Sequence, residues 1–79
     1  MPIPKPGFFP ELNIAVGRSA RKDRQPATIE AAIEDAHARA RKVLKKGRLH
    51  YRLIDVFAVG TNPISEYVVQ VEVGVEGES

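Results

Sequence analysis

Few side chains in this sequence are able to do catalytic chemistry. Ser65, His50 and Asp55 supply the residue types of a nucleophilic triad. They lie in or beside one expected hairpin, which has neither a strained nucleophile elbow nor a glycine-rich segment for an oxyanion hole. His37 and His50 could ligate a metal with Asp55 or Glu34, but the spacing matches no metal-binding pattern. We therefore expect neither an enzyme nor a metalloprotein.

A second group of side chains favours binding without catalysis. His50 and Arg52 flank Tyr51, and Gln70 and Glu72 lie on one face of the last expected strand. An aromatic ring beside cationic, amide and carboxylate groups suits a small planar or anionic ligand. Two interpretations stay open, which are a polar pocket between subunits and a dry subunit interface in which these residues pair.

The last strand, over residues 66–76, has the clearest pattern. One row is almost entirely valine and alternates with a mostly polar row; its members are Tyr67, Val69, Val71, Val73 and Val75. A period of two predicts a long antiparallel strand with one face on a core. Only one other segment has an apolar stripe long enough to cover that face.

That segment is an expected helix at 28–46, about nineteen residues long. Thr28 suits the N-cap, acidic residues follow it, and basic residues precede Gly47, which suits the C-terminal end. Apolar residues recur at steps of three or four, namely Ile29, Ala32, Ile33, Ala36, Ala40, Val43 and Leu44. This spacing predicts one amphipathic helix, whose alanines allow close approach to a sheet.

Two more strands are expected. Residues 11–18 alternate with Leu12, Ile14 and Val16 inward, and residues 48–60 form a long strand whose apolar parity switches near Leu53 and Ile54. The switch predicts a β-bulge or a change of partner strand.

The connections are also readable. The segment 60–63 is an expected turn, and 77–79 should fray. The polar segment 18–26 holds four cations without glycine, so it is either a solvated loop or an anion contact.

The expected fold class is α+β, with the order β-α-β-β and a three-stranded antiparallel sheet wrapped on one helix. Residues 1–10 hold four prolines and should form an extended arm, in which Phe8 and Phe9 dock on this subunit or a neighbour. Residues 11–79 form a single domain.

Length and composition indicate how this domain is stabilised. A chain of 79 residues has a thin core and, without cysteine, no disulfide, so we expect a homo-oligomer. The lack of cysteine, of a signal peptide and of a long apolar run favours a cytoplasmic protein that contacts no membrane.

Charge is distributed unevenly along the chain. Eleven of twelve basic residues lie between Arg18 and Arg52, while 53–79 holds five acids and no base. This layout can steer an anionic ligand or bring patches of neighbouring subunits together. The cations between 39 and 52, with Tyr51 beside them, leave a basic nucleic-acid-binding module as an alternative.

The chain resembles the dodecins. The resemblance covers residues 11–76 and is carried by the strand–helix–hairpin order, by 31–34 and 38–42 in the helix, and by Glu66-Tyr67 and 71–74 in the last strand. Dodecins are small flavoproteins of twelve subunits that store flavin without turning over a substrate. The resemblance thus implies a non-catalytic homododecamer and, as cofactor, FMN or riboflavin.

It also implies site residues. The family's flavin-stacking tryptophan falls on Leu49, or with a small shift on Tyr51, and its hydrogen-bonding glutamine falls on Val68. With Arg52 and Gln70, these complete the expected ligand site. Because Leu49 and Val68 replace the two flavin-contacting side chains, an oligomer that binds no flavin, with a purely structural role, is a further alternative.

Overall fold

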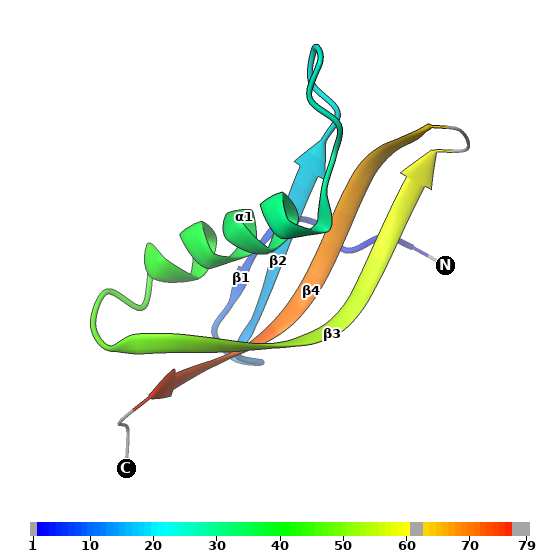
Figure 1. Ribbon diagram of the computed structural model, residues 1–79. Coiled ribbons are helices and arrows are strands. Elements are labelled where there is room, and N and C mark those ends of the chain that lie inside the picture. The colour runs from blue at the N-terminus through cyan, green and yellow to red at the C-terminus, as the bar shows by residue number, and fades with distance from the viewer. Residues whose placement is uncertain (1, 61–62, 77–79) are drawn as a thin grey trace.

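The computed structural model describes residues 2–60 and 63–76. It contains strands β1 (Gly7–Phe9), β2 (Ile14–Ala20), β3 (Arg48–Gly60) and β4 (Ile64–Glu76), and one helix, α1 (Ile29–Arg41). The strands form an antiparallel sheet in the order β1-β2-β4-β3, with α1 lying across one face (Figure 1). The expected α+β class with a single helix is confirmed. The expected number of three strands is wrong, because the sheet has four.

The additional strand comes from the proline-rich arm. Residues 7–9 pair with β2, since the last proline before them is Pro6 and their amides are free to join a ladder. Phe8 packs against the core below α1, as expected for a docked phenylalanine, whereas Phe9 is 42% exposed. The arm is therefore part of the sheet from Gly7 onward.

The helix begins as expected and ends early. Thr28 is the N-cap, and its hydroxyl accepts a hydrogen bond from the Ala31 amide. The prediction of a helix to residue 46 is wrong, because α1 ends at Arg41. The Arg41 guanidinium donates to the carbonyls of Leu44 and Gly47 and so holds the following loop folded back on the last turn.

Small residues set the distance between α1 and the sheet. The core cluster contains no large side chain; its members are Ala15, Ala32, Ala36, Ala40, Val69, Val71 and Val73. On β2, Gly17 lies so close to α1 that a Cβ there would be 2.1 Å from the Ala32 carbonyl oxygen. A larger residue at Gly17 would therefore separate helix and sheet.

This close approach corrects the expected orientation of β2. The sequence predicted Leu12, Ile14 and Val16 inward, yet Ala15 and Gly17 face α1 and Leu12 is 64% exposed. Val16 is buried on the opposite face of the sheet. Only the smallest side chains fit between α1 and β2 at this separation. A ranking by hydrophobicity alone places alanine and glycine below leucine, isoleucine and valine.

Asp35 fastens the helix to the sheet. Its Oδ2 accepts hydrogen bonds from the Arg18 amide (2.8 Å) and from Arg39 Nε (2.9 Å). β1 pairs with β2 only as far as Val16, so the Arg18 amide lies beyond the end of that ladder. Asp35 supplies the acceptor that this amide would otherwise lack.

β4 is a long antiparallel strand with one face on the core, as its pattern predicted, and it lies between β2 and β3. Its valine row faces α1, with Val69 and Val71 almost fully buried. Val68, expected to face away from the core, is only 2% exposed on the opposite face of the sheet. Figure 1 shows the segment before β1 passing behind the sheet on that side, so the far face is partly covered.

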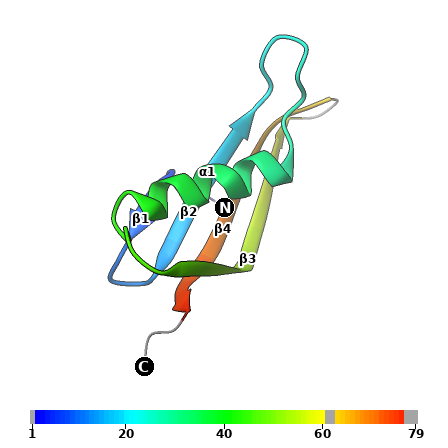
Figure 2. The ribbon, with the colours of Figure 1, turned by 60° about the vertical axis from the view of Figure 1, so that its left-hand side comes forward.

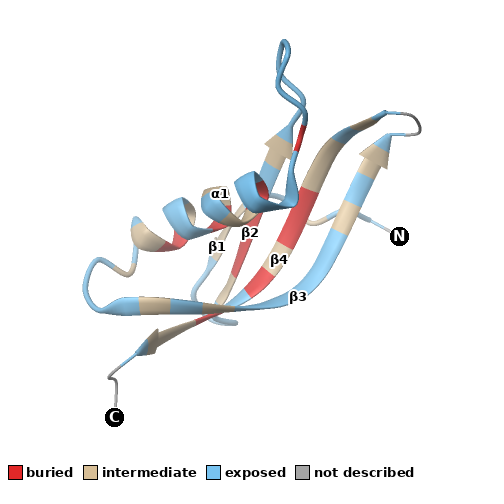
Figure 3. Cartoon of the chain, viewed as in Figure 1, coloured by how far each residue is buried: buried red, intermediate tan, exposed pale blue. Residues whose placement is uncertain are grey.

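β3 lies at one edge of the sheet and the three-residue β1 at the other, so β3 is the long edge strand. Its register with β4 shifts between Leu53 and Asp55, which confirms the expected bulge. α1 packs mainly against β2 and β4, and Figure 2 shows it crossing one face of the sheet. None of the thirteen residues of β3, all of them described, is buried (Figure 3).

The remaining connections are short. β2 extends to Ala20, past the expected end at 18, and a tight turn follows in which Lys22 and Gln25 pair and Asp23 has φ 51. The expected turn at 60–63 and the expected fraying at 77–79 fall mainly on residues outside the described ranges. In the described part of the chain, no helix combines the length and the apolarity needed to cross a bilayer.

Candidate binding pocket

The hairpin of β3 and β4 places polar side chains on the sheet face opposite α1. His50 pairs with Gly74 and Arg52 with Glu72, and alternation puts these four positions on the same face. The expected grouping of His50, Arg52 and Glu72 is therefore present. Together with Asn13, Val73 and Gly74 they line a pocket of about 270 Å³.

Gly74 makes room for the His50 ring. A Cβ at Gly74 would be 2.2 Å from His50 Nε2 and 2.6 Å from Cε1. The imidazole therefore occupies the space that a side chain at position 74 would need, and any side chain there would displace it. Its outer face remains free, because His50 is exposed.

Arg52 and Glu72 provide charge at the same site. Arg52 Nη2 lies 3.1 Å from Glu72 Oε1, with 75% and 48% of the two side chains exposed. A pair so open to water adds at most about 1 kcal/mol to stability, so it is not needed to hold the strands together. Its exposed guanidinium retains N–H donors for a ligand anion.

Asn13 closes the end of the pocket nearest β2. Its φ of 55 is the left-handed conformation that asparagine tolerates, and its carbonyl accepts the Val73 amide at 2.7 Å. Neither Asn13 nor Gly74 was among the expected site residues. Gly74 had a usable signal, since a glycine inside a strand marks close approach of another group; Asn13 had none.

The five predicted site residues do not share a surface. Leu49 and Tyr51 pack against the core on the α1 side, whereas Arg52 and Gln70 lie on the opposite face. Val68 is buried and offers no contact to a ligand. Of the five, only Arg52 lines the pocket.

Tyr51 takes part in a separate cluster beside α1. Its hydroxyl forms a hydrogen bond with His37 Nδ1, and the two rings meet edge to face at 5.4 Å and 70°. Burial raises the pKa of the Tyr51 phenol, and the positive charge of Arg41 partly offsets this rise. The cluster joins α1 to β3 and keeps Tyr51 on the α1 side of the sheet, away from the pocket.

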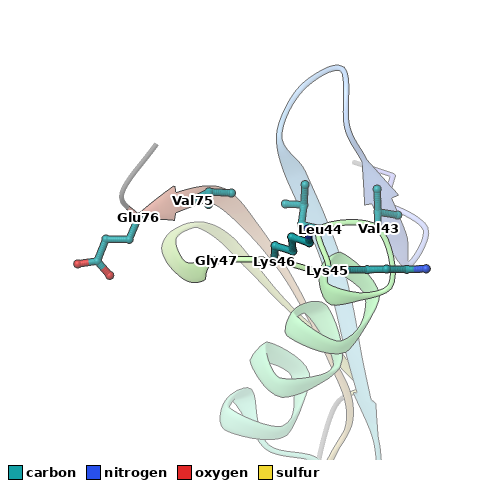
Figure 4. Close-up of a pocket in the computed structure, with 7 residues that line it drawn as sticks. All are labelled: Val43, Leu44, Lys45, Lys46, Gly47, Val75 and Glu76. Atoms are coloured by element: carbon teal, nitrogen blue, oxygen red, sulfur yellow. The ribbon is translucent and has the colours of Figure 1, made fainter. Parts of the chain in front are cut away.

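A larger and shallower pocket lies past the end of α1. It measures about 600 Å³ and is lined by Val43, Leu44, Lys45, Lys46, Gly47, Val75 and Glu76. In Figure 4 the charged ends of Lys45 and Glu76 point away from each other, and apolar side chains remain between them. No set of converging polar groups marks it as a ligand site.

Basic and acidic residues that are separated along the chain form ion pairs in the structure. On β4, Glu66, Glu72 and Glu76 pair with Arg18, Arg52 and Arg48 respectively. The acidic strand is thus neutralised by arginines of its own chain.

The cations expected to form a nucleic-acid footprint are similarly engaged. Four of seven (Arg39, Arg41, Arg48 and Arg52) bind carboxylates or carbonyls of the same chain, while Lys42, Lys45 and Lys46 are exposed. Three lysines at the end of a helix do not form a continuous track for phosphates.

The residue types of a triad are not brought together. The Ser65 hydroxyl donates to the Val59 carbonyl at 3.0 Å, at the far end of the hairpin from His50. Within residues 2–60 and 63–76, no three metal-ligating side chains gather.

No protein-family model matches the chain, and no curated protein or solved structure was found to be similar to it. Membership of the dodecin family therefore stays a prediction, and the function is argued from the geometry above.

Proposed function

We propose that this chain is the subunit of a non-catalytic, dodecin-like homo-oligomer that holds a small planar, anionic ligand in the pocket of His50, Arg52 and Glu72. Flavin is the first candidate ligand and twelve the first candidate number of copies, both from the resemblance. A cytoplasmic location, which the absence of cysteine favours, belongs to the same proposal.

The main support for an oligomer is the large solvent-accessible area of the single chain. Its accessible area is 5830 Å², whereas a compact monomer of 8.7 kDa exposes about 4,700 Å². The excess of about 1,100 Å² is of the order of what one partner contributes to a standard protein interface, about 800 Å².

The shape of the chain agrees with its area. The radius of gyration is 13.1 Å, against about 11.6 Å for a compact domain of this length. The dimensions of 46 × 28 × 16 Å describe a thin slab with one helix on one face. Such a slab buries little apolar surface on its own, and its largest fully buried side chains are valines. Assembly with other copies would cover apolar surface that the single chain leaves exposed.

The pocket supports a ligand with a flat ring and an anionic group. The free face of the His50 imidazole is suited to stacking, and the Arg52 guanidinium to a phosphate or carboxylate. Glu72 and Asn13 add hydrogen-bonding groups for the edge of a ring. The site is open to water, so it lacks the enclosed, low-dielectric environment in which charged groups catalyse efficiently.

Fluorescence titration of FMN and of riboflavin with the purified protein tests the ligand. We expect quenching by both, with FMN bound more tightly because its phosphate meets Arg52. His50→Ala should weaken both ligands about tenfold, while His37→Ala, the same change on the opposite face, should leave them unchanged.

Three outcomes would count against the site. Equal effects of the two histidine variants would place the ligand elsewhere. Equal affinities for FMN and riboflavin would remove the role of Arg52. Absence of quenching by an assembled protein would favour an oligomer with a purely structural role.

A further inference from the structure

We infer that two copies of the chain join through their β3 edges, antiparallel and about a two-fold axis that passes between Leu53 and Ile54. The inference rests on the proposed homo-oligomer and names the contact that builds it. It also assigns to the second copy a wall of the ligand pocket.

The first argument is the open edge. β3 is hydrogen-bonded to β4 alone, so one side of a thirteen-residue strand has unpaired amides and carbonyls. It contains neither proline nor lysine, the residues that commonly protect an edge. Leu53 is 47% exposed and Ile54 41% exposed at its centre. An edge of this kind favours pairing with another strand.

The second argument is the bulge, which makes β3 complementary to itself. Before the bulge, even-numbered residues such as His50 and Arg52 lie on the face opposite α1; after it, odd-numbered residues such as Asp55 and Phe57 do. In a register centred between Leu53 and Ile54, the numbers of two opposite residues sum to 107. Residue 52 of one copy then lies opposite residue 55 of the other, and residue 50 opposite residue 57. Each such pair on either side of the bulge then joins residues of the same face, as antiparallel pairing requires.

The third argument is charge. In this register Arg52 of each copy lies opposite Asp55 of the other, so two ion pairs form around the axis. Asp55 has no ion-pair partner among the residues that the structure describes, and Arg52 remains 75% exposed despite its contact with Glu72. A shift by one residue would oppose residues of different faces. A shift by two toward Phe57 would keep the faces matched but separate the charges.

The consequence concerns the pocket. The same register places Phe57 of the second copy opposite His50, on the face that carries the pocket. One chain offers about 270 Å³, slightly less than the roughly 300–1,000 Å³ of small-molecule sites. A second aromatic ring beside the imidazole would enlarge and enclose the site. The ligand class is therefore a flat aromatic system held between His50 and a phenyl ring.

Charge reversal with mixing tests the contact. Asp55→Lys opposes two cations, and Arg52→Glu opposes two anions, so each variant alone should assemble at a concentration at least about tenfold higher than the unaltered protein. In an equimolar mixture, the Arg52 of one variant meets the Asp55 of the other, and the introduced glutamate meets the introduced lysine, so both contacts return. We expect light scattering to show the original mass in the mixture only.

Rescue by mixing separates a lost contact from a lost fold, because a misfolded variant cannot be restored by its partner. Circular dichroism of each variant provides the matching control. If Asp55→Lys alone keeps the original mass at low concentration, the β3 contact is refuted while the oligomer stands. If the unaltered chain is a monomer, the proposed function fails first.

Disulfide trapping reads the register directly, because the chain has no cysteine. Arg48 and Val59 are opposite each other in the inferred pairing. The double variant Arg48→Cys with Val59→Cys should form a covalent dimer on oxidation, and neither single variant should. The two positions lie about 36 Å apart within one strand, too far for an internal bridge. A double variant that stays uncrosslinked while assembled would refute the register.

Discussion

The two halves of the sheet are built on different principles. Where β2 and β4 lie under α1, glycine, alanine and valine are packed so closely that Gly17 touches the helix backbone. On β3, by contrast, the larger apolar side chains of Leu53 and Ile54 are 47% and 41% exposed. The packed half contains the small residues and the open half the large ones. A domain that is stable alone would instead bury its large apolar side chains.

This difference teaches where the missing stability comes from. A core of alanines and valines buries little apolar area per residue, and each buried methylene contributes about 0.8 kcal/mol. The side chains able to add more, Leu53, Ile54 and Val56, are between 39% and 47% exposed. The packed half defines the fold, and the open half is available for other copies of the chain.

The largest expected effect is the loss of stability when the packing of α1 on β2 is disrupted. Gly17→Val should destabilise the chain by about 3 kcal/mol or more, because its Cβ would collide with the Ala32 carbonyl and the Ala36 amide. Thermal or urea unfolding followed by circular dichroism measures the loss. Ala58→Val, on the exposed β3, is the control and should change stability by less than about 0.5 kcal/mol. Equal losses would abolish the contrast between the halves.

The second effect loosens the attachment of the helix. Asp35→Ala should cost about 1–2 kcal/mol, since it leaves the Arg18 amide without its acceptor and Arg39 without its carboxylate. Urea unfolding checks the value, and amide exchange at Arg18 should accelerate. Glu34→Ala, an exposed neighbour on the same helix, provides the control. An unchanged exchange rate at Arg18 would show that Asp35 does not hold the two elements together.

The third effect is confined to the pocket on the sheet face opposite α1. Gly74→Ala should leave the stability of the chain within about 0.5 kcal/mol, since the flexible end of His50 gives way rather than the backbone. The displaced imidazole should weaken ligand binding by about two- to tenfold. NMR of the His50 ring and flavin titration measure both. A large loss of stability instead would mean that the pocket is part of the structural core.

The smallest effect concerns the cluster between the halves. Because burial raises the pKa of Tyr51 above its ordinary 10.0, the folded chain favours the neutral phenol. Its contribution is complete below about pH 10 and is lost as the pH rises through the folded pKa. Tyr51→Phe should therefore cost about 0.5 kcal/mol at neutral pH and flatten the alkaline decline in stability.

The test is unfolding measured from pH 8 upward, with Tyr67→Phe as the matched control. If the free energy of unfolding falls equally steeply with rising pH in both variants, a group other than Tyr51 causes the decline.

Local signals in the sequence predicted the elements well. The Thr28 cap, the valine row of β4 and the bulge near Leu53 each depend on a few neighbouring residues, and each is present. The end of α1 was missed because Val43 and Leu44 continue the apolar spacing, while Arg41 folds the chain back through carbonyls further along.

Features set by contacts distant in sequence could not be predicted in this way. The orientation of β2 follows from the helix–sheet distance, which puts Ala15 and Gly17 inward against their low hydrophobicity. The pairing of β1 with Ile14, Ala15 and Val16 is likewise a contact that the local pattern of residues 1–10 does not reveal.

The site was half predictable for a related reason. His50, Arg52 and Glu72 were expected to share a polar surface and do line one pocket. Tyr51, adjacent to both His50 and Arg52 in sequence, was grouped with them, but alternation along β3 turns its ring toward α1. Gly74 and Asn13 act through their backbones, which side-chain chemistry does not reveal.

The central claim is that the open half of the sheet is completed by other copies of the same chain. Sedimentation velocity of the purified protein at micromolar concentration tests it most directly. The account predicts a discrete closed assembly, near about 104 kDa if twelve copies of 8.7 kDa associate, with no stable species at the mass of one chain. A cooperatively folded monomer that persists over the whole concentration range would contradict it.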